Sequence, residues 1–353
     1  MELFRSKIIM KIAYIVPKLT NKGPVIVVKE LVTMMTKYGH ECKVFYFDKE
    51  TEISMPCGTE HISIYKSIDF NSFDIVHSHG IRPDCYIFIH KPRKCRAKTI
   101  TTLHNYVYQD FKYQYNVFVA ATAGTLWIKL LSRHDKVVTL SKNAMNYYSK
   151  WIDPKKLYYA YNTRFIEHTD EKPDIEDKKL INEFKGNSIL IGINAALTER
   201  KGVDQVIKAL PELKDYRLAV IGNGKEMTGL KKMATELGVH DRVLFMGYRK
   251  NAYRFLRYYD IYALPSRSEG FVLTLLEAAI YKKNVVCSDI PIFRETVSDE
   301  EAAFFEINNM PSLVKAVRRA HECGDLGKNL NDRYKKMYSP ECFYNKYISI
   351  YSK

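Results

Sequence analysis

The residues of this chain whose type and spacing most suggest chemistry are two glutamates, Glu269 and Glu277, which stand eight positions apart. Residues 260–264 before them predict a short buried strand, and the apolar spacing of residues 272–281 predicts a helix. The two acids therefore follow a strand-to-helix turn. Such a turn points free backbone N–H groups and the positive end of a helix dipole at one spot, so we expect an anion to bind there.

The expected distance between the two acids argues against a shared acid–base role. At a rise of roughly 1.5 Å per residue they would be about 12 Å apart, whereas the paired acids of glycosidases lie roughly 5–9.5 Å apart. We predict instead that each acid binds a different hydroxyl-bearing end of one long ligand. The phosphates of that ligand would lie over the amides of Gly270, Phe271 and Val272. A nucleotide sugar has this shape.

The frame PSRSEGF…LLEAA around the two acids resembles the signature of the retaining family 4 glycosyltransferases, which have the GT-B fold. The resemblance implies that Glu269 contacts the donor sugar and Glu277 the ribose. The alternative interpretation is an exposed glutamate near a helix end and a second solvated glutamate, with no ligand.

Two cations, Arg200 and Lys201, precede a helix predicted at residues 203–210. Cations at such a strand end can clamp the two phosphates of a nucleotide diphosphate and stabilise the charge of the leaving group. The loop resembles the family's G-R-L-x-x-x-K-G, with Lys201 in the lysine position. The family's arginine, however, falls at Ala196, and Arg200, four positions later, is the candidate substitute.

Further candidates lie at the ends of predicted strands in the first half of the chain. His104 closes the run 99–105 at a carboxyl end, where open α/β sheets bind ligands. It matches the family's T-x-H position, which faces the donor sugar and the acceptor; a structural histidine is the alternative. Gly23 resembles the family's loop near the donor phosphate, since glycine lets the backbone approach an anion. A plain helix-entry turn explains Gly23 as well. His77 and His79 share a strand face without a third ligand in sequence, so no metal is expected there.

Two candidates for donor binding in the second half rest on position. Gly222 and Gly224 form a G-x-G after a predicted strand, but Met227 stands where a dinucleotide fingerprint needs its third glycine, so an NAD site is not expected. The family has a similar strand end beside its donor site, which makes Gly222 a candidate. Tyr248 corresponds to the family's base-binding loop by position only.

Length, cysteines and charge set broader limits. A chain of 353 residues predicts two domains, and no apolar run approaches the roughly 18 residues of a membrane span. The start of the chain predicts a first buried strand and no signal peptide. Seven cysteines without a C-x-x-C pair argue against a disulfide framework and fit a reducing cytoplasm.

The positive charge is concentrated in the first half of the chain. Residues 1–165 contain 25 Lys and Arg against 13 Asp and Glu, and the remainder contains 30 against 27. The block 91–98 is the densest. This charge suits an anionic membrane surface, an anionic acceptor or a nucleic acid, although no nucleic-acid motif is present and a solvated lysine-rich surface fits equally. The aromatic stretch 106–131 suits a bilayer interface, a carbohydrate acceptor or helical core packing.

The predicted fold is α/β, with two Rossmann-like doubly wound domains that face a cleft, as in GT-B. Residues 1–165 would form an acceptor-binding domain and residues 166–338 a nucleotide-sugar-binding domain. The charged stretch 167–179 would link them. The helix predicted at residues 339–353 would cross back to the first domain, as the resemblance implies.

The predicted function is transfer of a sugar from a nucleotide diphosphate sugar, with UDP as the expected nucleotide, to a saccharide or lipid-linked saccharide. Retention of configuration is implied by the resemblance. Glu269, Lys201, Arg200 and His104 would carry catalysis, and no cofactor or metal is expected because the sequence has no Asp-x-Asp pair. The resemblance places the enzyme in bacterial surface-polysaccharide synthesis, in the cytoplasm and peripherally on the inner face of the cytoplasmic membrane. A sugar-nucleotide epimerase and a non-catalytic glycosyltransferase-like subunit are the alternatives.

Overall fold

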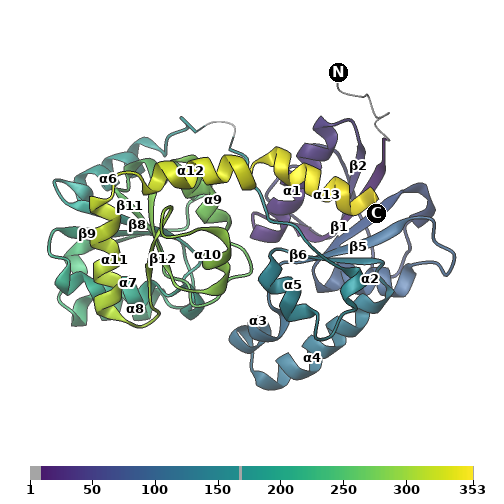
Figure 1. Cartoon of the computed structure of the whole chain (residues 1–353), viewed down its shortest axis with the longest axis horizontal. Coiled ribbons are helices and arrows are strands. Elements are labelled where there is room, and N and C mark those ends of the chain that lie inside the picture. Colours follow the sequence, from purple (N-terminus) through teal and green to yellow (C-terminus); the bar gives the residue numbers. More distant parts are fainter. Residues whose placement is uncertain (1–8, 167–168, 353) are drawn as a thin grey trace. The chain divides into compact units, whose positions relative to one another are not determined.

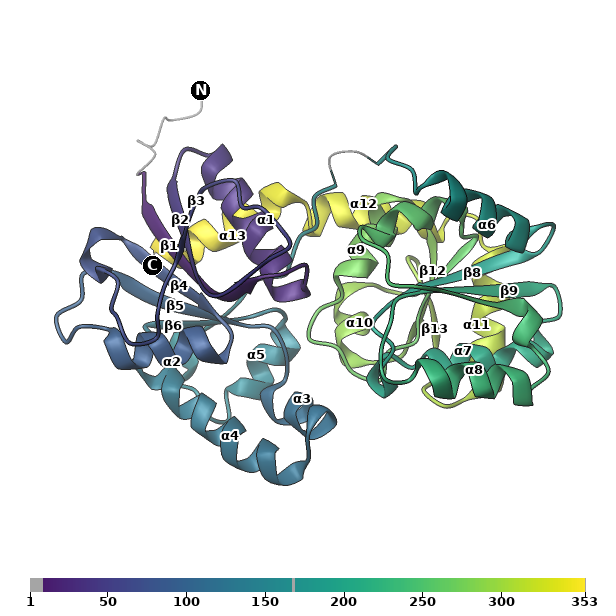
Figure 2. The ribbon, with the colours of Figure 1, turned by 180° about the vertical axis from the view of Figure 1, so that it is seen from behind.

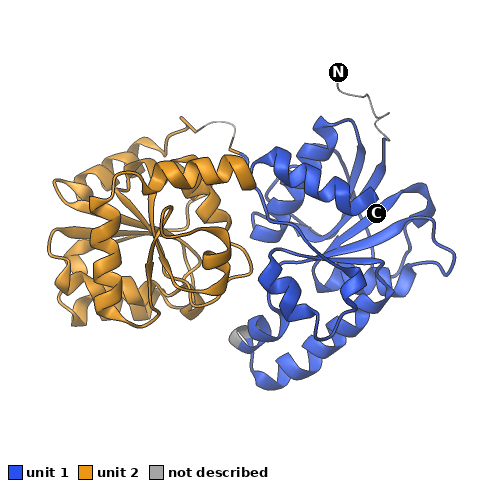
Figure 3. Ribbon diagram, viewed as in Figure 1, with its two compact units in different colours: residues 1–165, 339–353 blue, residues 166–338 orange. Residues whose placement is uncertain are grey.

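The computed structural model describes residues 9–166 and 169–352, with the side chains of Tyr113 and Gln114 excepted. Two predictions fall partly outside the described residues. They are the absence of a signal peptide, which concerns residues 1–8, and the link between the domains, which includes residues 167–168. The chain divides into two compact units (Figure 3). Unit 1 comprises residues 1–165 with 339–353, and unit 2 comprises residues 166–338.

Unit 1 is built on a seven-stranded parallel sheet within the described residues, with strand order β3-β2-β1-β4-β5-β6-β7. Its strands are β1 (Lys11–Leu19), β2 (Glu41–Thr51), β3 (Gly58–His61), β4 (Ile75–His79), β5 (Lys98–Leu103), β6 (Lys136–Thr139) and β7 (Leu157–Tyr159). Figure 1 labels β1, β2, β5 and β6 of this sheet. The order reverses between the neighbours β1 and β4. Open α/β sheets bind ligands at the carboxyl ends of strands beside such a reversal.

Helices cover both faces of this sheet, which explains why its central strands are almost wholly buried. The helices are α1 (Gly23–Lys37), α2 (Ile81–His90), α3 (Val107–Gln114), α4 (Val117–Leu130), α5 (Lys142–Tyr148) and α13 (Pro340–Ser352). The last helix returns to unit 1 and lies beside α1 (Figure 2). Its Tyr344 stacks on Tyr38 at a ring-centroid distance of 3.9 Å, and its Tyr347 and Tyr351 are buried against the sheet.

Unit 2 repeats this plan around a six-stranded parallel sheet in the part of the chain that the structure describes. Its order is β10-β9-β8-β11-β12-β13, with a reversal between β8 and β11. The strands are β8 (Ile189–Asn194), β9 (Tyr216–Ile221), β10 (Val243–Gly247), β11 (Ile261–Leu264), β12 (Asn284–Ser288) and β13 (Ala303–Phe305). The helices are α6 (Ile175–Lys185), α7 (Val203–Ala209), α8 (Met227–Glu236), α9 (Leu273–Ile280), α10 (Pro291–Thr296), α11 (Met310–Glu322) and α12 (Leu326–Met337).

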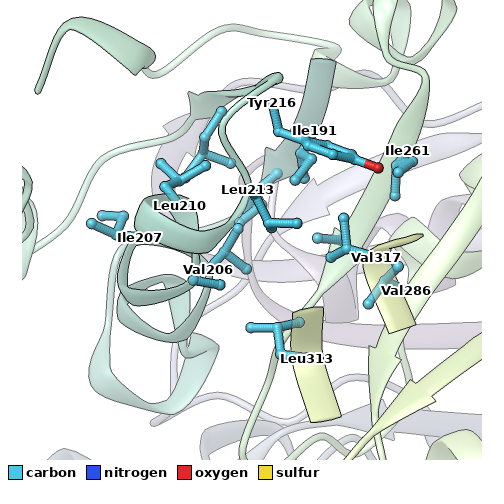
Figure 4. Close-up of a cluster of buried hydrophobic side chains, with 14 of the residues drawn as sticks. Ile191, Val206, Ile207, Leu210, Leu213, Tyr216, Ile261, Val286, Leu313 and Val317 are labelled. Atoms are coloured by element: carbon cyan, nitrogen blue, oxygen red, sulfur yellow. The ribbon is translucent and has the colours of Figure 1, made fainter. Parts of the chain in front are cut away.

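One apolar cluster of unit 2 joins the sheet to the helices that follow β8 and β13 (Figure 4). Ile191 from β8 and Val286 from β12 pack with Val206 of α7 and Val317 of α11, and all four side chains are buried. This packing fixes where the loop between β8 and α7 can run. Among the described residues, no helix is both long and apolar enough to span a bilayer.

Candidate active site

The reversal in the sheet of unit 2 brings together two loops that are distant in sequence. The loop after β8 carries Arg200 and Lys201, and the loop after β11 carries Glu269. The Lys201 Nζ donates to Glu269 Oε1 at 2.5 Å, and Arg200 Nη1 donates to Glu269 Oε2 at 2.9 Å. Ser266 Oγ donates to Oε1 as well, at 2.6 Å. Both cations therefore converge on one carboxylate.

The Glu269 carboxylate is the buried member of this cluster, with 6% of the residue exposed. Burial favours its neutral form, but the charges of Lys201 and Arg200 and the hydrogen bonds outweigh burial, so the pKa of Glu269 lies below its ordinary value. The two cationic side chains are more accessible than the acid. With two positive charges and one negative, the cluster presents a net positive charge to an approaching ligand.

Close backbone packing holds the cationic loop against the loop of Glu269. Gly202 has φ +65°, and a Cβ there would lie 2.0 Å from the carbonyl oxygen of Pro265. The Arg267 N–H donates to the Arg200 carbonyl at 2.8 Å, and Gln205 Nε2 donates to the Pro265 carbonyl at 2.8 Å. Only glycine fits at position 202 without a backbone shift, because any side chain would collide with main-chain atoms.

Gly222 has an equally demanding position beside the other end of the cationic loop. A Cβ on Gly222 would lie 1.8 Å from the Ala195 carbonyl oxygen, and one on Gly224 would lie 2.2 Å from the Leu197 carbonyl oxygen. The Leu197 N–H also donates to the Asn223 carbonyl. The G-x-G therefore lets two loops pack backbone to backbone and supports the segment that leads to Arg200. Contact between Gly222 and a donor remains a prediction.

The remaining residues of the turn precede or lie on α9. This helix begins at Leu273, one residue after the predicted start, and its N-cap Val272 makes no side-chain capping hydrogen bond. Gly270 and Phe271 are half-buried, and Val272 is buried. Glu277 lies on α9 and is 8% exposed. Burial first, and then the charge of Glu277, raise the pKa of Tyr262 on β11.

Tyr248 lies just beyond β10 and is 59% exposed. Its neighbour Arg249 is engaged in a bidentate ion pair with Asp177, at 2.7 and 3.0 Å. Of these two neighbours, Tyr248 is thus the one with a largely exposed side chain.

In unit 1, two candidates lie at the carboxyl ends of strands. Gly23 is the first residue of α1, after β1, and a Cβ there would meet no atom within 4 Å. The chain itself therefore does not require glycine at position 23. His104 follows β5 and is half-buried, and its Nε2 lies 2.9 Å from His79 Nδ1 at the end of β4. Burial lowers the pKa of His104 to about 3.

The structure thus brings Arg200, Lys201 and Glu269 into direct contact, with Glu277 on the adjoining helix, whereas Gly23 and His104 belong to unit 1. Sequence reasoning overlooked Ser266, Gly202 and the contact of His79 with His104. Each had a weak signal, because Ser266 is inside the PSRSEGF frame, Gly202 follows Lys201, and His79 belongs to an H-x-H pair. Within the described residues, no group of three or more His, Cys, Asp or Glu side chains could hold a metal ion.

Comparison with known proteins follows the division into units. The family model for glycosyl transferases group 1 matches residues 174–337, and the model for glycosyltransferase family 4 matches residues 22–163. The chain is 34% identical to the O-antigen biosynthesis glycosyltransferase WclY of Escherichia coli, over 97% of this chain and 98% of that protein.

Two further proteins are similar over most of the chain. The UDP-Gal:alpha-D-GlcNAc-diphosphoundecaprenol alpha-1,3-galactosyltransferase of Escherichia coli is 25% identical over 73% of this chain and 69% of that protein. Among solved structures, HepE of Anabaena in complex with UDP superimposes with a TM-score of 0.78 at 16% identity, over 97% of this chain and 100% of that one.

Proposed function

The chain belongs to the family 4 glycosyltransferases, and from this premise we propose that it transfers a sugar from a UDP-sugar to a saccharide or lipid-linked saccharide with retention of configuration. Membership makes the chain a glycosyltransferase, and the predicted GT-B fold with two Rossmann-like units is confirmed. The donor nucleotide, the stereochemical course and the acceptor are the proposed parts.

One observation supports donor binding above the others, namely the convergence of Arg200 and Lys201 on Glu269. Lys and Arg side chains make strong charged hydrogen bonds to phosphate as they do to carboxylate, so the two cations that bind Glu269 can also bind a diphosphate. The family arginine is absent at Ala196, yet Arg200 reaches the same carboxylate as Lys201. We therefore assign Arg200 to the role that the missing arginine has in the family.

In the proposed reaction, Lys201 and Arg200 bind the diphosphate and stabilise the negative charge that develops when the bond to the sugar breaks. The N–H groups at the start of α9 would add to this binding, because Val272 makes no side-chain capping bond and only the Leu275 N–H is shown donating to the Val272 carbonyl. Glu269 stays ionised and accepts hydrogen bonds from sugar hydroxyls, and Glu277 accepts from the ribose. These donors require no divalent ion, so we propose a metal-independent transfer.

The names of the relatives support the proposed setting. WclY is an O-antigen biosynthesis enzyme, and the Escherichia coli galactosyltransferase is named for a UDP-sugar donor and a diphosphoundecaprenol-linked acceptor. We propose that this chain acts in the same kind of surface-polysaccharide synthesis, in the cytoplasm at the inner face of the membrane that holds lipid-linked acceptors.

An exposed apolar face of α4 supports peripheral attachment to that membrane. Phe118 is 76% and Leu126 58% exposed, and the exposed positions of α4 recur with helical spacing, at 117, 118, 121, 122, 125, 126 and 129. Residues 111–134 contain Lys112, Lys129 and Arg133 and no Asp or Glu. An apolar face flanked by cations fits an anionic lipid surface.

The direct test is to incubate the purified chain with UDP-sugars and a lipid-linked saccharide, and to determine the anomeric configuration of the product by NMR. We expect the donor's configuration to be retained, and chelation of divalent ions to leave the rate unchanged. Inversion would contradict the proposed course. Conversion of the donor sugar without any acceptor would support the epimerase alternative instead.

The absence of the arginine at position 196 favours one second candidate, a glycosyltransferase-like subunit without activity. A thermal-shift screen with UDP and UDP-sugars separates the two, because a bound ligand stabilises the folded chain. Failure of every nucleotide to raise the melting temperature would favour the inactive subunit.

A further inference from the structure

Two histidines from neighbouring strands are in direct contact at the ligand-binding edge of the unit 1 sheet. His79 is the last residue of β4, and His104 follows β5. Their Nδ1 and Nε2 atoms, respectively, are 2.9 Å apart. Because a neutral imidazole has one N–H donor and one acceptor nitrogen, one ring donates this hydrogen bond and the other accepts it. The choice decides which nitrogen of His104 carries its proton.

Burial keeps both rings neutral. His79 is 1% exposed, and desolvation lowers its pKa well below the ordinary value, as it does for His104. The His77 ring lies against His79 at a centroid distance of 4.3 Å. At neutral pH, each ring of the pair is therefore a directional hydrogen-bonding group without charge.

The second nitrogen of His79 distinguishes the two possible arrangements. His79 Nε2 is buried and has no hydrogen-bond partner among the described residues. A proton on this atom would create a buried unsatisfied N–H. A proton on Nδ1 would instead leave Nε2 as an unused acceptor. Among backbone groups, buried orphan N–H donors are rarer than under-used acceptors, and we apply the same preference here.

We propose that His79 donates from Nδ1 to Nε2 of His104, and so fixes His104 as the tautomer with its proton on Nδ1. That N–H has no partner within the described residues, and His104 is half-buried. His104 then offers a neutral donor to a hydroxyl oxygen of a bound sugar. This last step rests on the proposed function, whereas the tautomer does not. His79 is a positioning residue, because it acts through His104.

A hydrogen-bonded chain behind the pair holds the rings in place. His77 Nδ1 lies 2.8 Å from the Tyr351 hydroxyl of α13, and His77 Nε2 lies 2.8 Å from the Thr102 hydroxyl of β5. Thr102 is in turn the register partner of His79 across the two strands. The last helix of the chain thus fixes His77, which packs against His79.

The test is nitrogen NMR of the full chain labelled with ¹⁵N-histidine, without any substrate, because the two ring nitrogens report the tautomer directly. Single histidine substitutions assign the signals. In the wild type we expect the proton of His104 on Nδ1. A proton on Nε2 of His104 would overturn the proposal.

Two variants of the positioning residue sharpen the test. His79→Leu removes the donor, so His104 should shift toward the Nε2-protonated tautomer and kcat/KM should fall by about tenfold, as for one lost hydrogen bond. His79→Asn places an amide nitrogen where Nδ1 stood, and should preserve both the tautomer and most of the activity. If His104 keeps its tautomer in His79→Leu, His79 does not set it. Because the NMR measurement uses no substrate, failure of sugar transfer would count against the proposed function and leave the tautomer assignment intact.

Discussion

The candidate region of unit 2 is built from charged side chains, whereas that of unit 1 is built from neutral ones. In unit 2, Lys201 and Arg200 both pair with the ionised Glu269, so the region holds two positive charges and one negative charge. In unit 1, His79 and His104 are neutral and are joined by one hydrogen bond. A charged cluster can exchange its internal partners for a charged ligand, whereas a neutral pair can only orient a donor. In the proposed reaction, the cations of unit 2 would bind and stabilise the diphosphate, and His104 of unit 1 would orient a hydroxyl group.

Removal of a cation from unit 2 should have the largest effect on activity. In Lys201→Ala or Arg200→Ala we expect kcat/KM to fall by about 10²–10³-fold, because in the proposed reaction each side chain would stabilise the departing diphosphate. Lys208→Ala is the matched control, since the Lys208 side chain is 46% exposed and pairs with Asp204 rather than with Glu269. Steady-state kinetics with a UDP-sugar provides the measurement.

The role of Arg200 as a substitute can be checked separately. Adding Ala196→Arg to the Arg200→Ala variant restores a cation at the family position, and should recover part of the lost activity. Normal activity in Arg200→Ala alone would mean that Arg200 is structural, and would leave the proposed role to Lys201.

The sequence alone predicted the helix that carries Glu277. The helix predicted at residues 272–281 is observed at Leu273–Ile280, because apolar periodicity reports a buried helix face directly. The meeting of Arg200 with Glu269 could not be derived in this way. These residues are 69 positions apart, and their contact depends on the strand order and on the fit of Gly202 against Pro265.

Two other features needed the three-dimensional structure for the same reason. Periodicity in one segment does not report the register between two strands, so the contact of His79 with His104 was not visible. The G-x-G at Gly222 was recognisable only as the end of a predicted strand, whereas the backbone of Ala195 that requires glycine there comes from another loop. Long-range packing, rather than local pattern, determines both.

The next largest effect is expected from glycine substitutions, which should show whether a glycine is needed for packing or for ligand contact. Gly202→Ala and Gly222→Ala force a Cβ into a carbonyl oxygen at a positive φ, and should destabilise unit 2 by about 1–3 kcal/mol. Gly23→Ala is the matched control, because its Cβ meets open space and stability should not change. Hydrogen exchange of unit 2 peptides measures this. Equal protection in all three variants would contradict the packing role.

Acid should affect the two regions at different pH. The pKa values of four histidines of unit 1 are lowered in the folded state, namely those of His77, His79, His104 and His134. Below about pH 6.5 these histidines therefore bind more protons in the unfolded state than in the folded state. The stability of unit 1 should fall as the pH decreases. Asp84, whose pKa burial raises to about 6, offsets part of this loss. The lowered pKa of Glu269 costs stability only below the ordinary glutamate value of 4.5.

Peptide-resolved hydrogen exchange at pH 7 and pH 5, corrected for intrinsic rates, tests this difference. Peptides from β4 and β5 should lose protection at pH 5, while the segment from Ser266 to Glu277 should not. The opposite order would show that the charged cluster, and not the neutral histidines, is the acid-sensitive region.

The smallest expected effect concerns the membrane. Phe118→Ser with Leu126→Ser should reduce cosedimentation with anionic vesicles by roughly tenfold, since each apolar side chain contributes about 1 kcal/mol or more on burial. Ile175→Ser is the control, because Ile175 is an exposed apolar residue of unit 2. Unchanged binding of the double variant would remove α4 from the proposed surface.

Calorimetric titration of UDP into the wild type, Arg200→Ala, Lys201→Ala and the Lys208→Ala control measures diphosphate binding by the two cations directly. If Arg200 and Lys201 together clamp the diphosphate, each of their substitutions weakens UDP binding by about tenfold or more, as expected for a lost charged hydrogen bond, and the control binds as the wild type does. Equal affinity in all four proteins would show that neither Arg200 nor Lys201 binds the diphosphate.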